Sequence, residues 1–172
     1  MKPAQRLIGG LFGSIALLLG LTGNSQAAPG DYTIKNAKSG RCLSVPATST
    51  DFAYLNQFSC KNYADQFWYR EAGAYDPDGT VWYKIINRHS GLCLSVDAAS
   101  MDDNARVTQY PCGGYADQYW REGPYDARTK GYQIRNWNSG KCLAVQDGSE
   151  AEAAPVIQFR CGSWTDHYWI TV

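Results

Sequence analysis

The sequence has few of the residues and patterns on which most enzymes and nucleic-acid-binding proteins depend. It contains two histidines, His89 and His167, and no Cys-x-x-Cys pair, so the usual ligand spacing of a zinc site is absent. It has no Gly-rich phosphate loop and no Ser/His/Asp grouping. It also lacks a Lys/Arg cluster of the kind that marks nucleic-acid binders and polybasic membrane patches. We therefore expect no catalytic residues, no metal, no cofactor and no nucleic-acid partner.

Long apolar runs are also scarce, and the one that occurs is at the N-terminus. Lys2 and Arg6 precede an apolar stretch over residues 7–21, and small residues surround Ala27, where a signal peptidase would cut. The alternative is a membrane anchor, but about 15 apolar residues are short of the ~20 that span a bilayer. We expect residues 1–27 to be a signal peptide and the mature protein to be secreted to the extracellular space, with no membrane span.

The charge of the mature chain is small. Removal of the signal peptide takes away two basic residues and no acidic residue, which changes the formal net charge from 0 to −2. Partners are therefore expected to be neutral or weakly charged.

Residues 31–172 contain one pattern that occurs three times. Each copy has a Tyr-x-Ile-x-Asn segment, a Ser-Gly-x-Cys-Leu-x-Val segment, a Gln-aromatic-x-Cys segment and a closing segment that ends in an aromatic-Trp pair. We place the three repeats at about residues 31–72, 81–123 and 131–172. A repeat of this regularity predicts three copies of one structural unit.

All six cysteines lie in this repeated part, two in each repeat. Six cysteines allow 15 connectivities in principle, but each repeat contains one pair at a nearly constant spacing. We expect one disulfide inside each repeat: Cys42–Cys60, Cys93–Cys112 and Cys142–Cys161. Each should contribute on the order of 3 kcal/mol to stability in the chain-entropy model.

The hydrophobic pattern predicts four short strands in each repeat. In the first repeat these strands fall at residues 32–35, 42–45, 54–60 and from residue 66 onwards. Alternation of apolar and polar side chains is typical of half-buried strands, and no helical periodicity occurs in the repeats. Short strands separated by turns predict an all-β barrel or sandwich.

Threefold repetition favours a closed, pseudo-threefold arrangement, because a unit this small cannot bury its own apolar face. One tryptophan near the end of each repeat is the natural centre of the core: Trp68, Trp120 and Trp169. Tryptophan contributes a large buried area, so three related by pseudo-threefold symmetry would fill a small barrel.

The repeated segments resemble those of the ricin B-type lectin domain. The resemblance rests on the Gln-x-Trp motifs at residues 66–68 and 118–120 and on the three Ser-Gly-x-Cys-Leu-x-Val segments, and it covers residues 31–172. This domain is a β-trefoil that is also found as family 13 carbohydrate-binding modules. The resemblance implies a β-trefoil of three four-stranded repeats. It also implies a protein that binds galactose- or xylose-type sugars or polysaccharide through several weak sites. Separately from the resemblance, we expect the protein to be non-catalytic and monomeric.

Two positions of the family's sugar site differ in this sequence. Two residues after the first Cys, the family has Asp and this chain has Ser44, Ser95 and Ala144. Just before the Gln of Gln-x-Trp, the family has Asn and this chain has Asp65, Asp117 and Asp166. A carboxylate makes stronger, charge-assisted hydrogen bonds than a hydroxyl. Our hypothesis is that these aspartates supply the sugar acceptor; the alternative is that each binds the backbone N–H groups of its own loop.

Aromatic side chains complete the candidate site. The resemblance implies a platform two residues before the second Cys, which is Phe58, Tyr110 and Phe159, although alternate strand positions face the core and these rings could be buried there. A second aromatic precedes each aspartate by two residues in a loop: Tyr63, Tyr115 and Trp164. Loop aromatics are less easily explained by packing alone. The candidate set also includes Gln66 and Gln118 of the Gln-x-Trp motifs.

The third repeat is expected to be the weakest site, because Ala144 offers no side-chain hydrogen bond and His167 replaces the Gln. Several weak sites on one rigid body would add through avidity on a polymeric glycan. The alternative function is a secreted β-trefoil protein-interaction or scaffold domain that has lost sugar binding. An enzyme is disfavoured, because aspartates from three different repeats should lie too far apart to act as a glycosidase pair.

Overall fold

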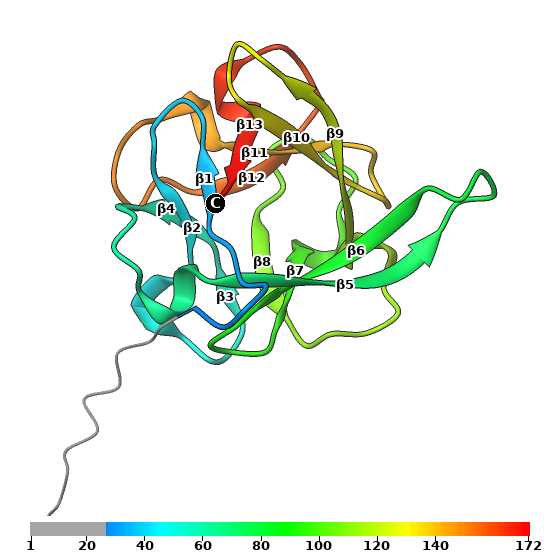
Figure 1. The fold of residues 1–172 in the computed structure, drawn as a ribbon, viewed down its shortest axis with the longest axis horizontal. Coiled ribbons are helices and arrows are strands. Elements are labelled where there is room, and N and C mark those ends of the chain that lie inside the picture. Colours follow the sequence, from blue (N-terminus) through cyan, green and yellow to red (C-terminus); the bar gives the residue numbers. More distant parts are fainter. Residues whose placement is uncertain (1–26) are drawn as a thin grey trace, which may run out of the picture.

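The computed structural model describes residues 27–172, so the predicted signal peptide lies almost wholly outside the described residues. All strands belong to one sheet of 13 strands (Figure 1). The first repeat contains β1 (Ile34–Asn36), β2 (Cys42–Ser44), β3 (Ala53–Tyr54), β4 (Asn56–Phe58) and β5 (Trp68–Tyr75). The second contains β6 (Val81–Asn87), β7 (Cys93–Val96), β8 (Val107–Tyr110) and β9 (Tyr119–Asp126). The third contains β10 (Gly131–Asn136), β11 (Cys142–Val145), β12 (Val156–Phe159) and β13 (Tyr168–Thr171).

The helical content of residues 27–172 consists of short 3₁₀ helices, two in each repeat: η1 (Pro46–Thr48), η2 (Ala64–Gln66), η3 (Asp97–Ala99), η4 (Ala116–Gln118), η5 (Gln146–Gly148) and η6 (Thr165–His167). The count of strands exceeds the predicted twelve by one, because the third strand of the first repeat is divided at Leu55 into β3 and β4. Within the described part of the chain, no helix is long and apolar enough to cross a membrane.

Six strands form a closed barrel. Antiparallel pairs link β1 to β13, β13 to β10, β10 to β9, β9 to β6 and β6 to β5. A bridge between Tyr32 and Trp68 joins the two ends, with both of its N–H···O bonds at 2.9 Å. Six of the remaining strands form one hairpin in each repeat, β2–β4, β7–β8 and β11–β12, and the short strand β3 pairs with β8. A six-stranded barrel with three such hairpins is a β-trefoil, so the predicted fold is confirmed.

The core lies on the pseudo-threefold axis, as predicted. Trp68, Trp120 and Trp169 are fully buried in one cluster with Leu, Ile and Val side chains from all three repeats. Each indole N–H donates to the carbonyl of the leucine after the first Cys, at 3.3, 2.9 and 2.9 Å for Leu43, Leu94 and Leu143. The buried polar atom of each tryptophan is therefore satisfied, and the core forms without a desolvation penalty at these groups.

Polar side chains bind each repeat to its neighbour. Gln57, Gln109 and Gln158 are fully buried. Gln109 donates to the carbonyls of Ser49 and Asp51 in the preceding repeat, at 2.9 and 2.6 Å, and the other two glutamines make the matching bonds. Because each loop is held by a residue of another repeat, the three units close into a ring.

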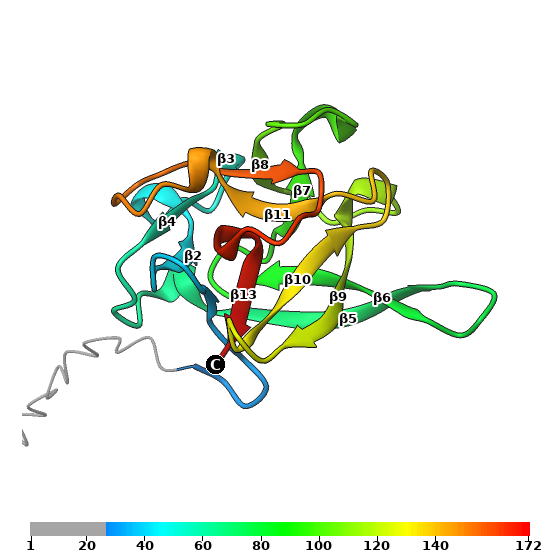
Figure 2. The same ribbon diagram turned by 90° about the horizontal axis from the view of Figure 1, so that it is seen from above.

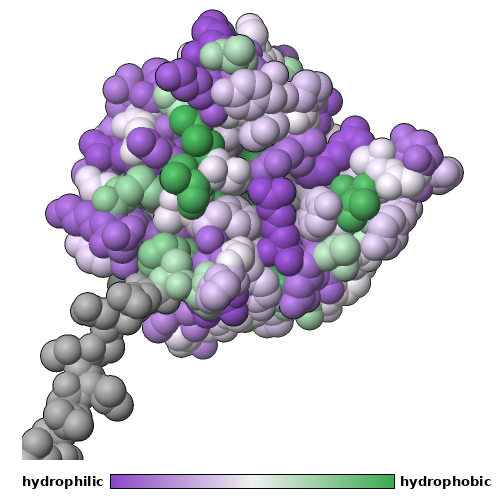
Figure 3. All heavy atoms as spheres, viewed as in Figure 1, coloured by the Kyte–Doolittle hydropathy of each residue, from purple (hydrophilic) through white to green (hydrophobic). Residues whose placement is uncertain are grey.

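The three disulfides join the cysteines within each repeat, which confirms one disulfide per repeat. The hairpin of β5 and β6 extends away from the barrel in both ribbon views (Figures 1 and 2). On the face seen in Figure 3, most of the surface is hydrophilic and the apolar atoms form small, separate patches. Patches of this size are normal on soluble proteins.

Candidate functional site

Three hollows of similar size lie at equivalent places in the three repeats. Their volumes are about 360, 400 and 370 Å³ for the first, second and third repeats. Each is bordered by the second strand of its repeat, the 3₁₀ helix that follows this strand, the third strand and the loop before the last strand. We call them the first, middle and third pockets. Volumes in this range suit small ligands.

The pockets bring together most of the residues that the sequence predicts. The first pocket is lined by four of them: Ser44, Phe58, Tyr63 and Asp65. The middle pocket is lined by four: Ser95, Tyr110, Tyr115 and Asp117. The third is lined by three, together with the alanine at the serine position: Phe159, Trp164, Asp166 and Ala144. Residues that are up to 21 or 22 positions apart in the chain therefore meet at one site.

A hydrogen bond between serine and aspartate fixes the carboxylate in the first two pockets. Ser44 Oγ donates to Asp65 Oδ2 at 2.5 Å, and the Val45 N–H donates to the same oxygen at 3.0 Å. Ser95 and Val96 make the same pair of bonds to Asp117. Among residues 27–172, no hydrogen bond reaches the other oxygen, Oδ1, of either aspartate, although Asp65 and Asp117 are almost fully buried, at 4% and 5% exposure. One carboxylate oxygen thus orients the group, and the other remains available as an acceptor.

The aspartates reach the pocket from the side opposite the serine. The serine takes the place at which the family has Asp, and the carboxylate that faces it comes from the loop before the last strand. The backbone of this loop is held by a buried asparagine of an adjacent barrel strand: Asn87 Nδ2 donates to the Asp65 carbonyl at 2.8 Å, and Asn136 Nδ2 to that of Asp117 at 2.7 Å. The carboxylate is therefore rigidly positioned by two repeats.

The platform aromatics lie on the surface. Tyr110 is 45% exposed, and Phe58 and Phe159 are half-buried; all three border their pockets. In the middle pocket, the rings of Tyr110 and Tyr115 are edge to face, 6.4 Å apart. In the third, Phe159 and Trp164 are arranged alike at 6.1 Å. Such an arrangement gives both pockets an apolar wall.

Glycines allow two of the loop aromatics to fold down over their own loops. A Cβ added at Gly113 would lie 2.4 Å from the Tyr115 ring, and one at Gly162 would lie 2.1 Å from the Trp164 ring. The first repeat has Lys61 at this place, so Tyr63 is not packed on a glycine. Glycine is required here for close approach, since neither residue has a positive φ.

Gln66 and Gln118 lie behind the pockets, which they do not line. Gln66 accepts a bond from the Lys61 N–H at 3.0 Å and donates to the Ser59 carbonyl at 2.9 Å; Gln118 makes the matching bonds. Both are fully buried. Their role in the structure is to close the loop that carries the pocket aromatic and the aspartate.

The third pocket keeps the asparagine support, since Asn36 Nδ2 donates to the Asp166 carbonyl at 2.8 Å, but it lacks the serine and the Gln. Ala144 offers no hydroxyl, and Asp166 Oδ2 instead lies 3.7 Å from Nε2 of His167. His167 occupies the Gln position, and its buried Nδ1 has no partner among the described residues. Burial lowers the pKa of His167, and the neighbouring Asp166 carboxylate opposes this shift. Lys38 and Arg160 also line this pocket, so its charge differs from that of the other two.

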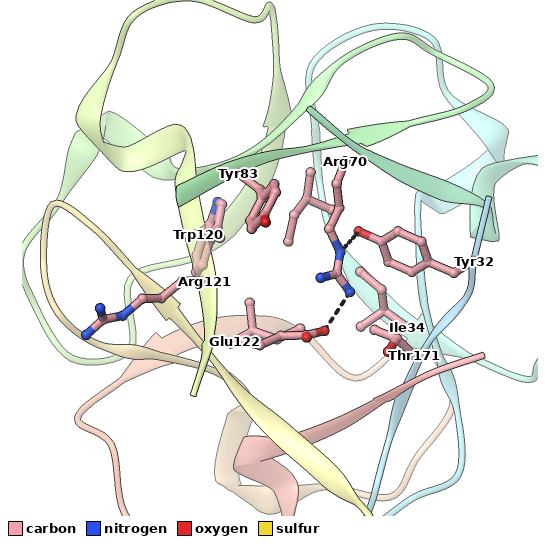
Figure 4. A pocket seen from close by; sticks show the side chains of 10 residues that line it. Tyr32, Ile34, Arg70, Tyr83, Trp120, Arg121, Glu122 and Thr171 are labelled. Atoms are coloured by element: carbon pink, nitrogen blue, oxygen red, sulfur yellow. Dashed lines mark hydrogen bonds and ion pairs between the residues drawn. The ribbon is translucent and has the colours of Figure 1, made fainter. Parts of the chain in front are cut away.

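A fourth cavity, at one mouth of the barrel, is closed by side chains. Arg70 donates to Tyr32 Oη at 3.0 Å and forms an ion pair with Glu122 at 2.6 Å (Figure 4). The cavity that remains has a volume of about 10 Å³, which is room for about one water molecule. Burial raises the pKa of Tyr32 to about 12, against the opposing effect of Arg70. This cluster closes the barrel and is too tightly filled for a sugar.

Sequence reasoning missed the residues that the 3₁₀ helices η1, η3 and η5 bring to the pockets. In each of these helices two consecutive residues have φ between 51° and 57°: Ala47 and Thr48, Ala98 and Ala99, Asp147 and Gly148. A left-handed conformation at residues other than Gly is strained and is often found at ligand sites. Glycine is the residue that usually marks a left-handed conformation in a sequence, and only the third repeat has one in this pair. The sequence therefore gave little indication of these turns.

The fold and the pockets define a class of protein, a β-trefoil whose repeats each carry a shallow aromatic and acidic pocket. The model of the ricin-type β-trefoil lectin domain-like family matches residues 21–82 and 74–159. The chain therefore belongs to the ricin-type β-trefoil lectin domain-like family. A comparison with curated protein sequences found no match.

Solved structures share this fold. ThreeFoil, a designed threefold-symmetric protein, is 34% identical, with a TM-score of 0.74 over 83% of this chain and 98% of that one. The exo-β-1,3-galactanase of Clostridium thermocellum is 26% identical, with a TM-score of 0.76 over 84% of this chain and 30% of that enzyme. The Polyporus squamosus lectin, solved with Neu5Acα2-6Galβ1-4GlcNAc bound, is 15% identical, with a TM-score of 0.68 over 85% of this chain and 49% of that one. The family match supports a carbohydrate-binding role.

Proposed function

We propose that this chain is a secreted, non-catalytic carbohydrate-binding protein with several weak sites for galactose- or xylose-type sugars or polysaccharide. The observation that carries the proposal is the recurrence of one pocket in all three repeats, each with an aromatic wall beside a carboxylate. An aromatic ring stacks on the C–H face of a sugar. The carboxylate meanwhile accepts charge-assisted hydrogen bonds from the hydroxyl groups of the sugar. This is the combination that sugar recognition needs.

The first and middle pockets are the stronger candidates. In both, a serine and a backbone N–H hold one carboxylate oxygen and leave the other free to accept. A preorganised acceptor avoids the cost of ordering the group when the ligand binds. The third pocket has neither of these bonds, so we assign it the weakest affinity. Pockets on separate repeats of one rigid ring would bind a polymeric glycan together.

The same arrangement supports the proposal of a non-catalytic protein. Each aspartate belongs to its own pocket, and Asp65 and Asp117 are held by the serine of their own repeat. A glycosidase needs two carboxyl groups that flank one bond, and the three equivalent aspartates, Asp65, Asp117 and Asp166, lie in separate pockets. The three disulfides are consistent with an extracellular location.

The proposal is tested by a glycan-array and polysaccharide pull-down screen of the protein without residues 1–27. We expect binding to galactose- or xylose-containing glycans, weakened about tenfold, or by about 1.4 kcal/mol, in Asp117→Asn and in Tyr115→Ala. Circular dichroism checks that both variants remain folded. Binding that neither variant changes would place the site elsewhere. No binding by the folded wild-type protein would favour the protein-interaction or scaffold function.

A further inference from the structure

The middle pocket differs from the other two in having an aromatic wall that another repeat, the first, supplies; the third pocket receives Asn104 and Lys38 from other repeats instead. Strand β3 pairs with β8, so that Ala53 is opposite Gln109 and Tyr54 is opposite Thr108. This register places the preceding residue, Phe52, beside Tyr110. Their ring centroids are 6.4 Å apart, and Phe52 lines the middle pocket.

A difference of one residue in loop length creates this wall. The Cys42–Cys60 pair has a separation of 18, against 19 in the other two repeats, and the missing residue falls in the loop before β4. Counted back from the Gln of each repeat, Phe52 corresponds to Asn104 and Ala153. Those two residues have φ values of 68° and 57° and form a bulge against the next repeat. Phe52 does not have a positive φ, and its strand continues without a bulge.

The result is a row of four exposed aromatic rings that crosses the boundary between two repeats. The centroid distances are 5.2 Å from Tyr54 to Phe52, 6.4 Å from Phe52 to Tyr110 and 6.4 Å from Tyr110 to Tyr115. Each ring lies at 68–80° to the next. One sugar ring presents a single apolar face to a wall, so it cannot stack on two nearly perpendicular rings. The Phe52 ring is therefore available to a neighbouring sugar.

The same wall orients a second acceptor. Tyr54 Oη donates to Asp97 Oδ2 at 3.0 Å, and Asp97 lines the middle pocket beside Asp117. The positions that match Asp97 are Pro46 in the first repeat and Gln146 in the third. The middle pocket thus has two carboxylates, Asp97 and Asp117, each with aromatic rings beside it. The first pocket has one carboxylate, Asp65.

We propose that the middle pocket binds at least two linked sugar residues of a glycan chain. Tyr110 stacks on one residue, which Tyr115 and Asp117 contact from the side, and Phe52 with Asp97 holds the next. The first and third pockets, which lack such a wall, hold one residue each. This inference rests on the proposed function, since it extends the same pocket.

The test compares sugars of different length by titration calorimetry. The probes are galactose and xylose, and the tetrasaccharides xylotetraose and β-1,3-linked galactotetraose. The full-length chain carries Tyr63→Ala and Trp164→Ala, exposed substitutions that weaken the other two pockets. We expect a tetrasaccharide to bind at least about tenfold tighter than its monosaccharide. Adding Phe52→Ala should remove most of the gain in affinity of the tetrasaccharide over the monosaccharide, and Tyr54→Phe should reduce this gain less. The exposed control Met101→Ala should leave the gain unchanged.

Each outcome has a separate meaning. Monosaccharide binding without a gain for the tetrasaccharide overturns the two-sugar site and leaves the proposed function intact. A gain that persists in Phe52→Ala, with the fold checked by near-ultraviolet circular dichroism, also overturns it. If the wild-type protein binds none of the four sugars, the proposed galactose or xylose specificity is contradicted. The proposal of a two-sugar site then fails as well.

Discussion

Arg70 and Glu122 occupy the same place in successive repeats, two residues after Trp68 and Trp120, and they form an ion pair at the mouth of the barrel (Figure 4). The third equivalent residue is Thr171, which lines the same cavity. Repeat symmetry thus brings a cation, an anion and a neutral group together. A ring of three identical repeats would bring three like groups together instead, so this contact depends on the divergence of the repeats.

Arg70→Gln is expected to lower the free energy of unfolding by about 1–3 kcal/mol, because Glu122 and the Tyr32 hydroxyl lose a common donor in a partly buried site. Arg160→Gln is the matched control. Its ion pair with Asp103 is long, at 3.8 Å, and its side chain is 70% exposed, so a change below about 0.5 kcal/mol is expected. Urea denaturation measures both. Equal effects would show that the mouth cluster adds no more than a surface pair.

Alkaline pH should destabilise the protein through Tyr32. Its pKa is raised by burial to about 12 in the folded state, from 10.0, so the folded state favours the protonated hydroxyl. The stabilisation is complete below pH 10 and is lost as the pH rises from 10 to about 12, where the unfolded chain loses the proton first. The loss should be on the order of 2 kcal/mol.

The control for this pH effect is Tyr32→Phe, which keeps the ring and removes the ionisable group. Unfolding free energies of the two proteins, measured by urea denaturation at intervals between pH 8 and 12, should converge above pH 10. Parallel curves over this range would refute the assignment of the alkaline loss to Tyr32.

His167→Gln should stabilise the protein and reduce its sensitivity to acid. The substitution introduces the residue that the first two repeats have at this place, and it removes a buried nitrogen without a partner, a defect that costs about 1–3 kcal/mol. The pKa of His167 is lowered by burial, so the folded state favours the neutral ring. Its contribution is present above pH 6.5 and decreases as the pH falls below that value.

Thermal denaturation at pH 7.5 and 5 measures this prediction. The variant should have a higher melting temperature at both values, with the larger difference at pH 5. A difference that does not grow toward pH 5 would contradict the role of the imidazole.

Gly113→Ala should weaken sugar binding at the middle pocket about three- to tenfold, or by about 0.7–1.4 kcal/mol. The new methyl group would lie 2.4 Å from the Tyr115 ring and force this ring out of its position. Gly114→Ala provides a close control, because a Cβ there meets nothing within 4 Å and the backbone accepts alanine. Calorimetric titration with the best glycan from the screen should show a loss for the first variant alone. Equal affinities would mean that the position of Tyr115 is unimportant.

The fold was predictable because its signal is repeated. Trp68, Trp120 and Trp169 stand at matching places in three aligned segments, and a closed ring is the arrangement that buries all three. The disulfides were predictable for the same reason, since each repeat offers a single pair of cysteines.

The details of the pockets could be predicted only in part. The candidate aromatics and aspartates came from the repeat and from the resemblance, and the structure gathers them at three sites. The bond between Ser44 and Asp65 was not foreseen, because it joins residues 21 positions apart whose facing depends on the hairpin and on the buried asparagine. The burial of Gln66 behind the pocket depends on loop closure, which the motif alone does not reveal.

Because Phe52 borders the middle pocket, this pocket depends on residues from two different repeats. The floor of this pocket is encoded in the second repeat and the wall in the first, so recombination between the two repeats would separate them in one event. If the first repeat were replaced by a copy of the second, the pocket of the following repeat would be bordered by the counterpart of Asn104 in place of Phe52. Selection for binding of a longer glycan would therefore act on the order of the repeats as well as on their residues.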